Sequence, residues 1–212
     1  GIGGALVIDG RLYRGSGGIA SELGHLRPGL HCEQPDQVLE SIAAGWGIAA
    51  SAASLLGEPI SHPIDRLTDG TGHAEPEDVR RRLIECEESD ERYAGDLLDR
   101  CDGDPQQLSA RIVAEAADDG NRLALEVFER ACRAYGWALA QMITLLAPEV
   151  IVLGGGVSLA GEALFLEPVR KYVAGYVFPP LADSYRIVPA ALGEEVVLHG
   201  ALALAAEADT GE

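Results

Sequence analysis

Basic side chains are scarce in this sequence. Its 16 Lys and Arg residues stand against 34 Asp and Glu, which gives a formal net charge of −18 over 212 residues. Because binding to a nucleic-acid backbone depends on clustered Lys and Arg, this balance argues against nucleic acid as a partner of this chain. An acidic surface mainly indicates good solvation and specifies no function by itself.

Long apolar runs and paired cysteines are also missing. No stretch approaches the roughly 18 uninterrupted apolar residues of a membrane span, and no secretory signal pattern opens the chain. The four cysteines form neither a CxxC pair nor a dense cluster. These absences favour a cytoplasmic chain with reduced thiols, without a disulfide framework or a membrane partner.

Hydrophobic residues are plentiful and periodically arranged. They make up 47% of the chain, enough for the core of one domain or of one domain with an appendage. The opening glycines run into a predicted hairpin that turns at Asp9-Gly10. Residues 37–56 predict a helix that Gly45 and Gly47 weaken near Trp46.

The second half of the chain alternates between helix and strand patterns. Residues 104–120 predict a helix opened by Asp104 and Pro105, and residues 121–147 predict a long helix with one apolar face for docking on a sheet. Further elements are predicted as short strands at 149–153 and 186–190, and as helices at 162–173 and 194–208. The alternation predicts an α/β fold, whereas residues 57–103 read as an inserted or peripheral segment.

Two glycine clusters are candidate phosphate or nucleotide contacts. Gly1, Gly3 and Gly4 precede the hairpin, where backbone N–H groups without a Cβ can approach a phosphate closely. The triple glycine at 154–156 follows an apolar strand, where an open α/β sheet exposes backbone groups to a ligand. Each cluster is equally compatible with a tight turn that needs glycine.

Glu22, His25 and Glu40 are candidate ligands for a polyol. Glu22 and His25 flank a glycine within a loop, a spacing that can aim a carboxylate and an imidazole at one set of hydroxyl groups. Taken alone, both residues also fit a solvated loop, and Glu40 fits an ordinary acidic residue in the first turn of a helix.

Taken together, several segments occur in the order and approximate spacing of the ROK family of bacterial sugar kinases and sugar-sensing repressors. The chain resembles that family over essentially its whole length, least over residues 57–103. The segments that carry the resemblance are GIGGALVIDGRLYRGSGGIASELGH, VLESIAAG, APEVIVLGGGVSLAGE and LHGALALAA.

The resemblance implies a fold and a function. The fold would be the carboxy-terminal lobe of an actin-like (ribonuclease H-like) ATPase, a mixed sheet flanked by helices over residues 1–212, with the amino-terminal lobe outside this chain. The activity would be phosphorylation of a hexose such as glucose by ATP with Mg²⁺, in a homodimer.

Roles transfer residue by residue. Glu22 and His25 match the family's ExGH sugar-binding motif, and Glu40 matches its later sugar-contacting Glu. The expected nucleotide contacts are Gly1, Gly3 and Gly4 of the second phosphate loop and Gly154, Gly155 and Gly156 of the adenosine-binding loop. In the family the base that deprotonates the acceptor hydroxyl lies in the earlier lobe, so no catalytic residue is expected in this chain and the chain alone should be inactive.

Two departures from the family pattern bear on these expectations. The cysteine cluster of the family is reduced here to Cys32, and with His25 and His31 it offers too few thiolates for a structural zinc, so no metal site is expected. Ser21 replaces a glycine before the ExGH motif. The alternatives to a kinase are the sugar-sensing module of a transcriptional repressor and a sugar-binding homologue without catalysis.

Overall fold

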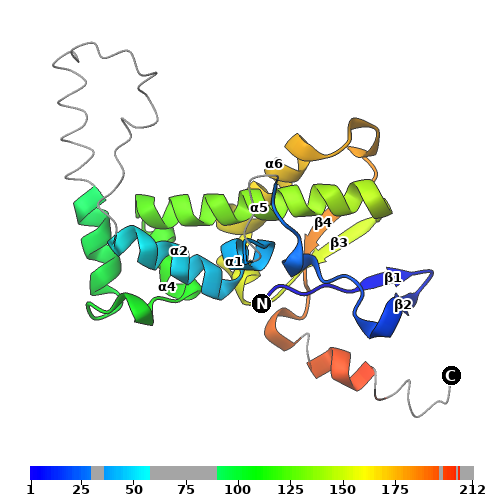
Figure 1. Ribbon diagram of the computed structural model, residues 1–212, viewed down its shortest axis with the longest axis horizontal. Helices are drawn as coiled ribbons and strands as arrows, with labels where there is room; N and C mark the ends of the chain where they lie inside the picture. The colour runs from blue at the N-terminus through cyan, green and yellow to red at the C-terminus, as the bar shows by residue number, and fades with distance from the viewer. Residues whose placement is uncertain (30–35, 58–89, 196–197, 204, 206–212) are drawn as a thin grey trace.

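The chain opens with the predicted hairpin. β1 (Leu6–Ile8) pairs antiparallel with β2 (Arg11–Tyr13), and Asp9 and Gly10 have φ values of 51° and 77°. Positive φ at both central residues is what a two-residue turn between twisted strands requires, so the prediction is confirmed. The computed structural model, shown in Figure 1, describes residues 1–29, 36–57, 90–195, 198–203 and 205.

The helical segment predicted at 37–56 is two helices. α1 (Leu39–Ala43) and α2 (Gly45–Gly57) are separated by Ala44, whose ψ of 160° is extended. The predicted weakness is therefore a full break, located just ahead of Gly45. It gives α2 its own N-terminus, which faces the candidate site described below.

The helix predicted at 104–120 begins later than expected. Asp104 is a cap, but only of the single 3₁₀ turn Pro105–Gln107, whose backbone donates to its carboxylate at 3.0 Å. Ser109 then caps α4 (Ala110–Asp118) through a 3.2 Å hydrogen bond. The predicted start was wrong because two capping residues lie close together, and only the second precedes a segment with a buried face.

The long helix α5 (Arg122–Leu146) agrees with the prediction at both ends. Asn121 caps it by accepting a 3.1 Å hydrogen bond from the backbone N–H of Ala124. Ala147 ends it in the left-handed conformation, with φ of 43°, directly before Pro148. Because proline cannot continue the helix, the C-terminus is fixed by sequence.

α5 belongs to two hydrophobic clusters. Its N-terminal half packs with α1, α2 and α4, where Val127 and Phe128 are buried. Its C-terminal half packs Leu139 and Ile143 against strands and helices farther along the chain. The predicted docking of this helix on a sheet thus holds for its C-terminal half only.

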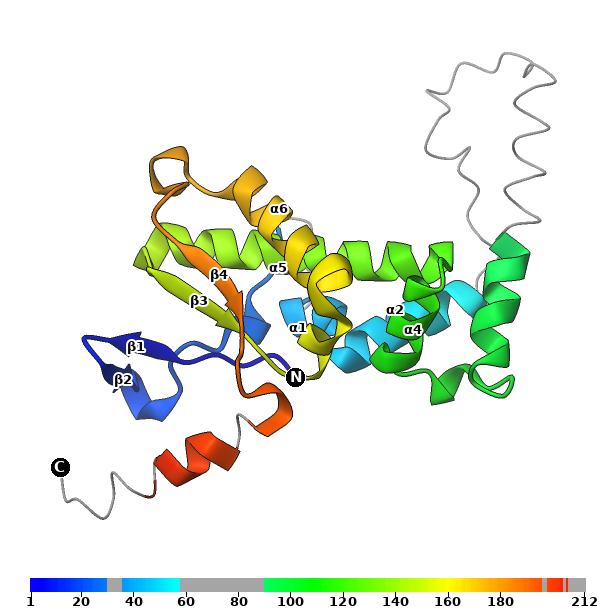
Figure 2. The same cartoon turned by 180° about the vertical axis from the view of Figure 1, so that it is seen from behind.

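The remaining described strands lie before and after a helix in the sequence and pair with each other. β3 (Val150–Leu153) pairs in parallel with β4 (Arg186–Pro189), and the connection between them contains a π-helical turn (Glu162–Leu166) followed by α6 (Glu167–Tyr176). α6 lies alongside α5, as Figure 2 shows. The predicted strands and the helix between them are confirmed.

The expected single mixed sheet does not appear among the described residues. They form two separate two-stranded sheets, one antiparallel (β1–β2) and one parallel (β3–β4). Strand patterns do not specify which strands become neighbours: a tight turn joins the first pair, the α6 crossover joins the second, and no described strand links the two pairs. The α/β class itself is confirmed, with helices predominating.

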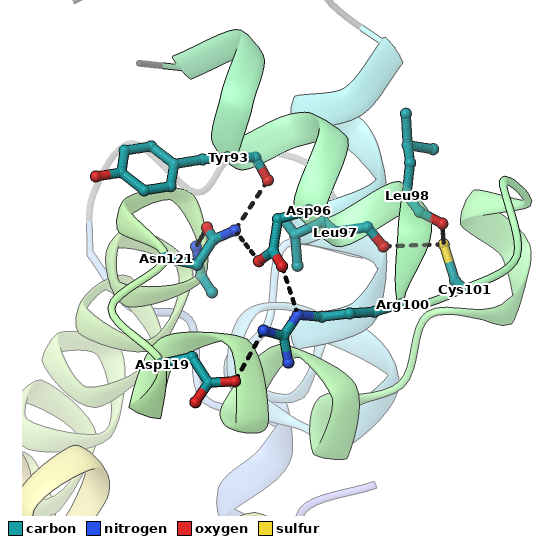
Figure 3. Close-up of polar contacts among 9 residues, drawn as sticks. Tyr93, Asp96, Leu97, Leu98, Arg100, Cys101, Asp119 and Asn121 are labelled. Carbon is teal, nitrogen blue, oxygen red and sulfur yellow. Dashed lines mark hydrogen bonds and ion pairs between the residues drawn. The ribbon is translucent and has the colours of Figure 1, made fainter.

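A polar network centred on the buried Asn121 joins the helical residues 90–99 to the α4–α5 junction (Figure 3). Asn121, only 3% exposed, donates at 2.8 Å to the Asp96 carboxylate and at 2.8 Å to a backbone carbonyl of the same helix. Arg100 pairs with Asp96 at 3.0 Å and with Asp119 at 2.8 Å. The network fixes the end of α4 relative to its neighbours.

Most of the segment predicted as inserted or peripheral, residues 58–89, lies outside the described residues. Its described end, at Leu97 and Cys101, is buried in the first hydrophobic cluster. Of the predicted closing helix, residues 198–203 are helical and the rest is only partly described. None of the described helices is long and apolar enough to cross a bilayer.

Candidate functional site

The ExGH loop packs directly on the first residues of the chain. Gly24 is buried, and a Cβ at this position would collide with the backbone carbonyl of Ile2. Only glycine allows this approach, so the glycine directly before His25 is fixed by packing. The loop is therefore held against the start of the glycine segment.

Glu40 joins the same segment from the other side. The backbone N–H of Ile2 donates to its Oε2 at 3.2 Å, and Leu39 N donates to Leu26 O at 2.7 Å. The second hydrogen bond ties the end of the ExGH loop to the start of α1. Three segments far apart in sequence thus meet around the Gly1–Ile2 backbone.

Glu22 and His25 lie on the exposed side of this assembly. Both side chains are exposed, whereas Glu40 is half-buried. His25 N donates to Glu22 O at 3.1 Å within a short 3₁₀ turn, which keeps the two residues on one loop. Ser21 has φ of 69°, a left-handed conformation that favours glycine, so the departure from the family pattern places strain directly before the motif.

The two glycine clusters lie at different depths. Gly4 packs closely against the Ser21 carbonyl, whereas Gly3 has open space around it. Gly154 directly follows β3 and lies beside Ala190, and after Gly155 a 3₁₀ turn runs from Gly156 to Ala160. Gly1 and Gly156 are the members that come together.

They meet in a cavity of about 870 Å³. Its other walls are the N-terminus of α2 and one face of α4, and the buried ring of Phe128 lies in its floor. The size falls within the range of small-molecule sites, roughly 300–1,000 Å³. The lining residues are Gly1, Gly45, Trp46, Ala49, Leu108, Ser109, Ala110, Arg111, Ala114, Glu115, Asp118, Phe128, Gly156, Val157, Leu159 and Ala160.

Sequence reasoning missed the α2 and α4 walls. Both are formed by helix starts, Gly45 and Ala110, that approach each other across more than sixty positions of the chain. No local pattern reports such an approach. The one available signal was Trp46, a large aromatic residue between two glycines at the start of a helix.

The predicted sugar residues do not line this cavity. Glu22, His25 and Glu40 are absent from its lining, although Glu40 accepts a hydrogen bond from Ile2 and the adjacent Gly1 is part of that lining. Among the described residues, no three His, Cys, Asp or Glu side chains gather closely enough to hold a metal ion. His31 and Cys32, the other two zinc candidates, lie outside the described residues.

Together, these features define a helix-rich α/β protein with a cavity that includes Gly1, Gly45 and Gly156 in its lining. Residues 1–208 match the ROK family, and the chain belongs to that family.

Individual relatives extend this result. The chain is 29% identical over 212 residues to the glucokinase of Thermotoga maritima, covering 98% of this chain and 56% of that protein. It is 23% identical over 204 residues to the xylose repressor of Caldicellulosiruptor bescii, covering 96% of this chain and 43% of the repressor. The chain thus spans about half the length of the curated relatives it matches.

Among solved structures, the chain resembles a ROK family glucokinase from Streptomyces griseus in complex with glucose and AMPPNP. The superposition has a TM-score of 0.66 at 25% identity and covers 91% of this chain and 53% of that one.

Proposed function

We propose that this chain is the carboxy-terminal lobe of an ATP-dependent hexose kinase of the glucokinase type, with the actin-like ATPase fold. The observation that best supports this proposal is the position of Gly1–Ile2. Gly1 lines the cavity together with Gly156, and the next peptide N–H donates to Glu40. A nucleotide cavity and a sugar-binding carboxylate would then share one backbone segment, as transfer between two bound substrates requires.

The cavity fits a nucleotide in size and in chemistry. Gly1 and Gly156 bring backbone to it without side chains, and both α2 and α4 begin at its wall. Backbone N–H groups at glycine loops and helix starts favour phosphate oxygens. Bound ATP would supply the phosphoryl group; the described residues form no cluster suited to hold Mg²⁺, and we assign none to it.

The sugar would lie on the other side of the Gly1–Ile2 backbone. Glu22 and Glu40 can accept hydrogen bonds from sugar hydroxyls, and His25 can donate or accept according to its tautomer. The described residues position the acceptor sugar, and the base that removes its proton is proposed to lie in the other lobe. We extend the proposal to a cytoplasmic homodimer with glucose as the representative hexose.

A sugar-responsive repressor is the second candidate. It is favoured by the match to a xylose repressor over 96% of this chain. Both candidates use the same polar loop, so sugar binding alone does not separate them. ATP-dependent formation of a sugar phosphate by the full-length protein would support the kinase, and sugar binding without turnover would support the repressor or a non-catalytic homologue.

The sugar assignment is tested by Glu22→Gln in the full-length protein. A hydrogen bond to a charged group contributes roughly 1.5–3 kcal/mol, so hexose binding should weaken about ten- to a hundredfold in calorimetry while ATP binding is unchanged. Glu91→Gln, at an exposed position of another helix, is the matched control and should alter neither. Unchanged hexose affinity in both Glu22→Gln and His25→Ala would remove these residues from the sugar site.

A further inference from the structure

Trp46 is exposed inside a concave site. Its side chain is 53% exposed although it lines the cavity, whereas the other tryptophan of the chain, Trp137, packs against the first hydrophobic cluster. An indole left open to water within a pocket retains a large apolar face that a ligand can cover. Trp46 belongs to neither hydrophobic cluster, so the packing of α2 does not account for this residue.

Several residues that line the cavity together with Trp46 are small. Gly45 and Ala49 lie on α2, and Ala110 and Ala114 lie on α4. Small side chains on both helices leave room in the cavity for a flat group. Aromatic rings prefer stacked or edge-on contacts, and nucleic-acid bases stack on tryptophan whatever their identity.

The charges of the cavity also favour a ligand with an uncharged part. Among its described lining residues, Arg111 is the one cationic side chain, and it pairs with Glu115 at 2.8 Å. Asp118 adds a further acidic group. A polyanionic ligand therefore gains little from side-chain charge here, so its affinity must come from backbone N–H groups and from contacts to an uncharged part.

We propose that Trp46 is the base-stacking residue of this cavity, which takes a purine nucleotide with the base against the indole. The inference rests on the proposed nucleotide site and adds the residue that binds the base. A lone phosphate chain offers no flat face, and the proposed sugar residues Glu22, His25 and Glu40 do not line the cavity, so neither ligand is assigned to Trp46. The adenine ring of ATP is the representative ligand.

The experiment uses the full-length protein and three variants: Trp46→Ala, Trp46→Phe and Trp137→Phe. ATP, adenosine and inorganic tripolyphosphate are titrated in turn by calorimetry and by tryptophan fluorescence. Because a stacked base contributes roughly a ten- to hundredfold factor in affinity, Trp46→Ala should weaken ATP and adenosine binding by that factor and leave tripolyphosphate binding unchanged. Trp46→Phe keeps an aromatic face and should retain most of the affinity.

Fluorescence identifies the residue directly. Adenosine should lower the emission of the wild type and of Trp137→Phe by the same absolute amount, and it should leave the emission of Trp46→Phe unchanged. Thermal melting of each variant controls for its fold.

Two results overturn the inference and are distinguishable. If the wild type binds ATP but Trp46→Ala binds it equally well, the indole is covered by something other than the base and the proposed function survives. If the wild type binds no ATP, the proposed function fails and the inference fails with it.

Discussion

At the scale of single residues, Asn121 has the most demanding environment in the described part of the chain. Its carbonyl oxygen caps α5, while its amide nitrogen donates to the Asp96 carboxylate and to the Tyr93 carbonyl, both on the helix of residues 90–99, at 2.8 Å each. Only an amide provides an acceptor and two donors in one short side chain. The sequence predicted a helix start here but had no means of showing the two donor contacts.

Asn121→Asp separates the cap from the network. Aspartate caps a helix as well as asparagine does, but here it loses both donors and places a second carboxylate against Asp96. We expect the free energy of unfolding to fall by about 2–3 kcal/mol in urea titrations, because a buried charge is left facing a like charge. Ser109→Asp, at the exposed cap of α4, should change it by less than about 0.5 kcal/mol. Equal effects at both caps would mean that the donor contacts contribute nothing.

Cys132 gives the chain a pH-dependent stability. The side chain is fully buried on α5, and burial, assisted by the charge of Glu129, raises the pKa of its thiol from 9.0 to about 12. Below pH 9 the thiol is protonated in both states and stability is unaffected. Between pH 9 and 12 the unfolded chain loses the proton while the native chain keeps it, so stability falls as pH rises.

The size of this effect can be measured against Cys132→Ala. From pH 9 to pH 10 the wild type should lose about 1 kcal/mol more of its unfolding free energy than the variant does, although the variant starts lower because of its cavity. Urea unfolding at both pH values provides the comparison. Parallel losses in the two proteins would contradict the raised pKa.

At the scale of elements, α5 and α6 cross at Gly136. A Cβ at this position would run into the Cβ of Tyr172 and the adjoining backbone, so the crossing requires a glycine in the interior of α5. The long apolar pattern of α5 predicted the helix correctly, yet periodicity alone gave no hint of which helix would lie at this point. Helix approach is set by the facing surface as much as by the helix itself.

Gly136→Ala should therefore reverse the usual effect of that substitution. In an open helix interior, alanine stabilises by about 1 kcal/mol, but here the overpacking should destabilise the chain by about 1–3 kcal/mol. Gly175→Ala in α6 is the matched variant, because no atom lies within 4 Å of the added Cβ, and it should stabilise slightly. Thermal melts of the two variants should move in opposite directions; a Gly136→Ala protein that melts higher would disprove the close approach.

The predicted elements also show where local signals suffice. The Asp9-Gly10 turn and the Pro148 stop depend on a few adjacent residues, and both agree with the structure. Asp104 carried a capping signal as strong as that of Ser109, and the choice between them depended on which following segment found a buried face. In this chain, the sequence predicted the end of an element correctly where no second capping residue lay nearby.

At the scale of the whole molecule, residue types and motif spacing suggested candidate site residues but not the shape of the site. The roles proposed for both glycine clusters and for the polar loop stay predictions. No sequence pattern indicated that Gly1 and Gly156 would share a cavity with two helix starts, because that depends on how α5 holds α2 and α4 around Phe128. The single mixed sheet was the main error, since strand patterns do not specify which strands become neighbours.

The Gly1–Ile2 backbone contributes Gly1 to the cavity lining and the N–H of Ile2 to Glu40, so it is placed to couple the binding of the two proposed ligands. If a bound nucleotide fixes this peptide in the position that Glu40 also stabilises, each ligand raises the affinity for the other by the same factor, commonly between about 5 and 150. In the full-length protein, hexose titrated with and without AMPPNP, and AMPPNP titrated with and without hexose, should give equal ratios. Glu40→Ala should bring both ratios toward one. Ratios of one in the wild type would mean that the two ligands bind independently and that this peptide does not couple them.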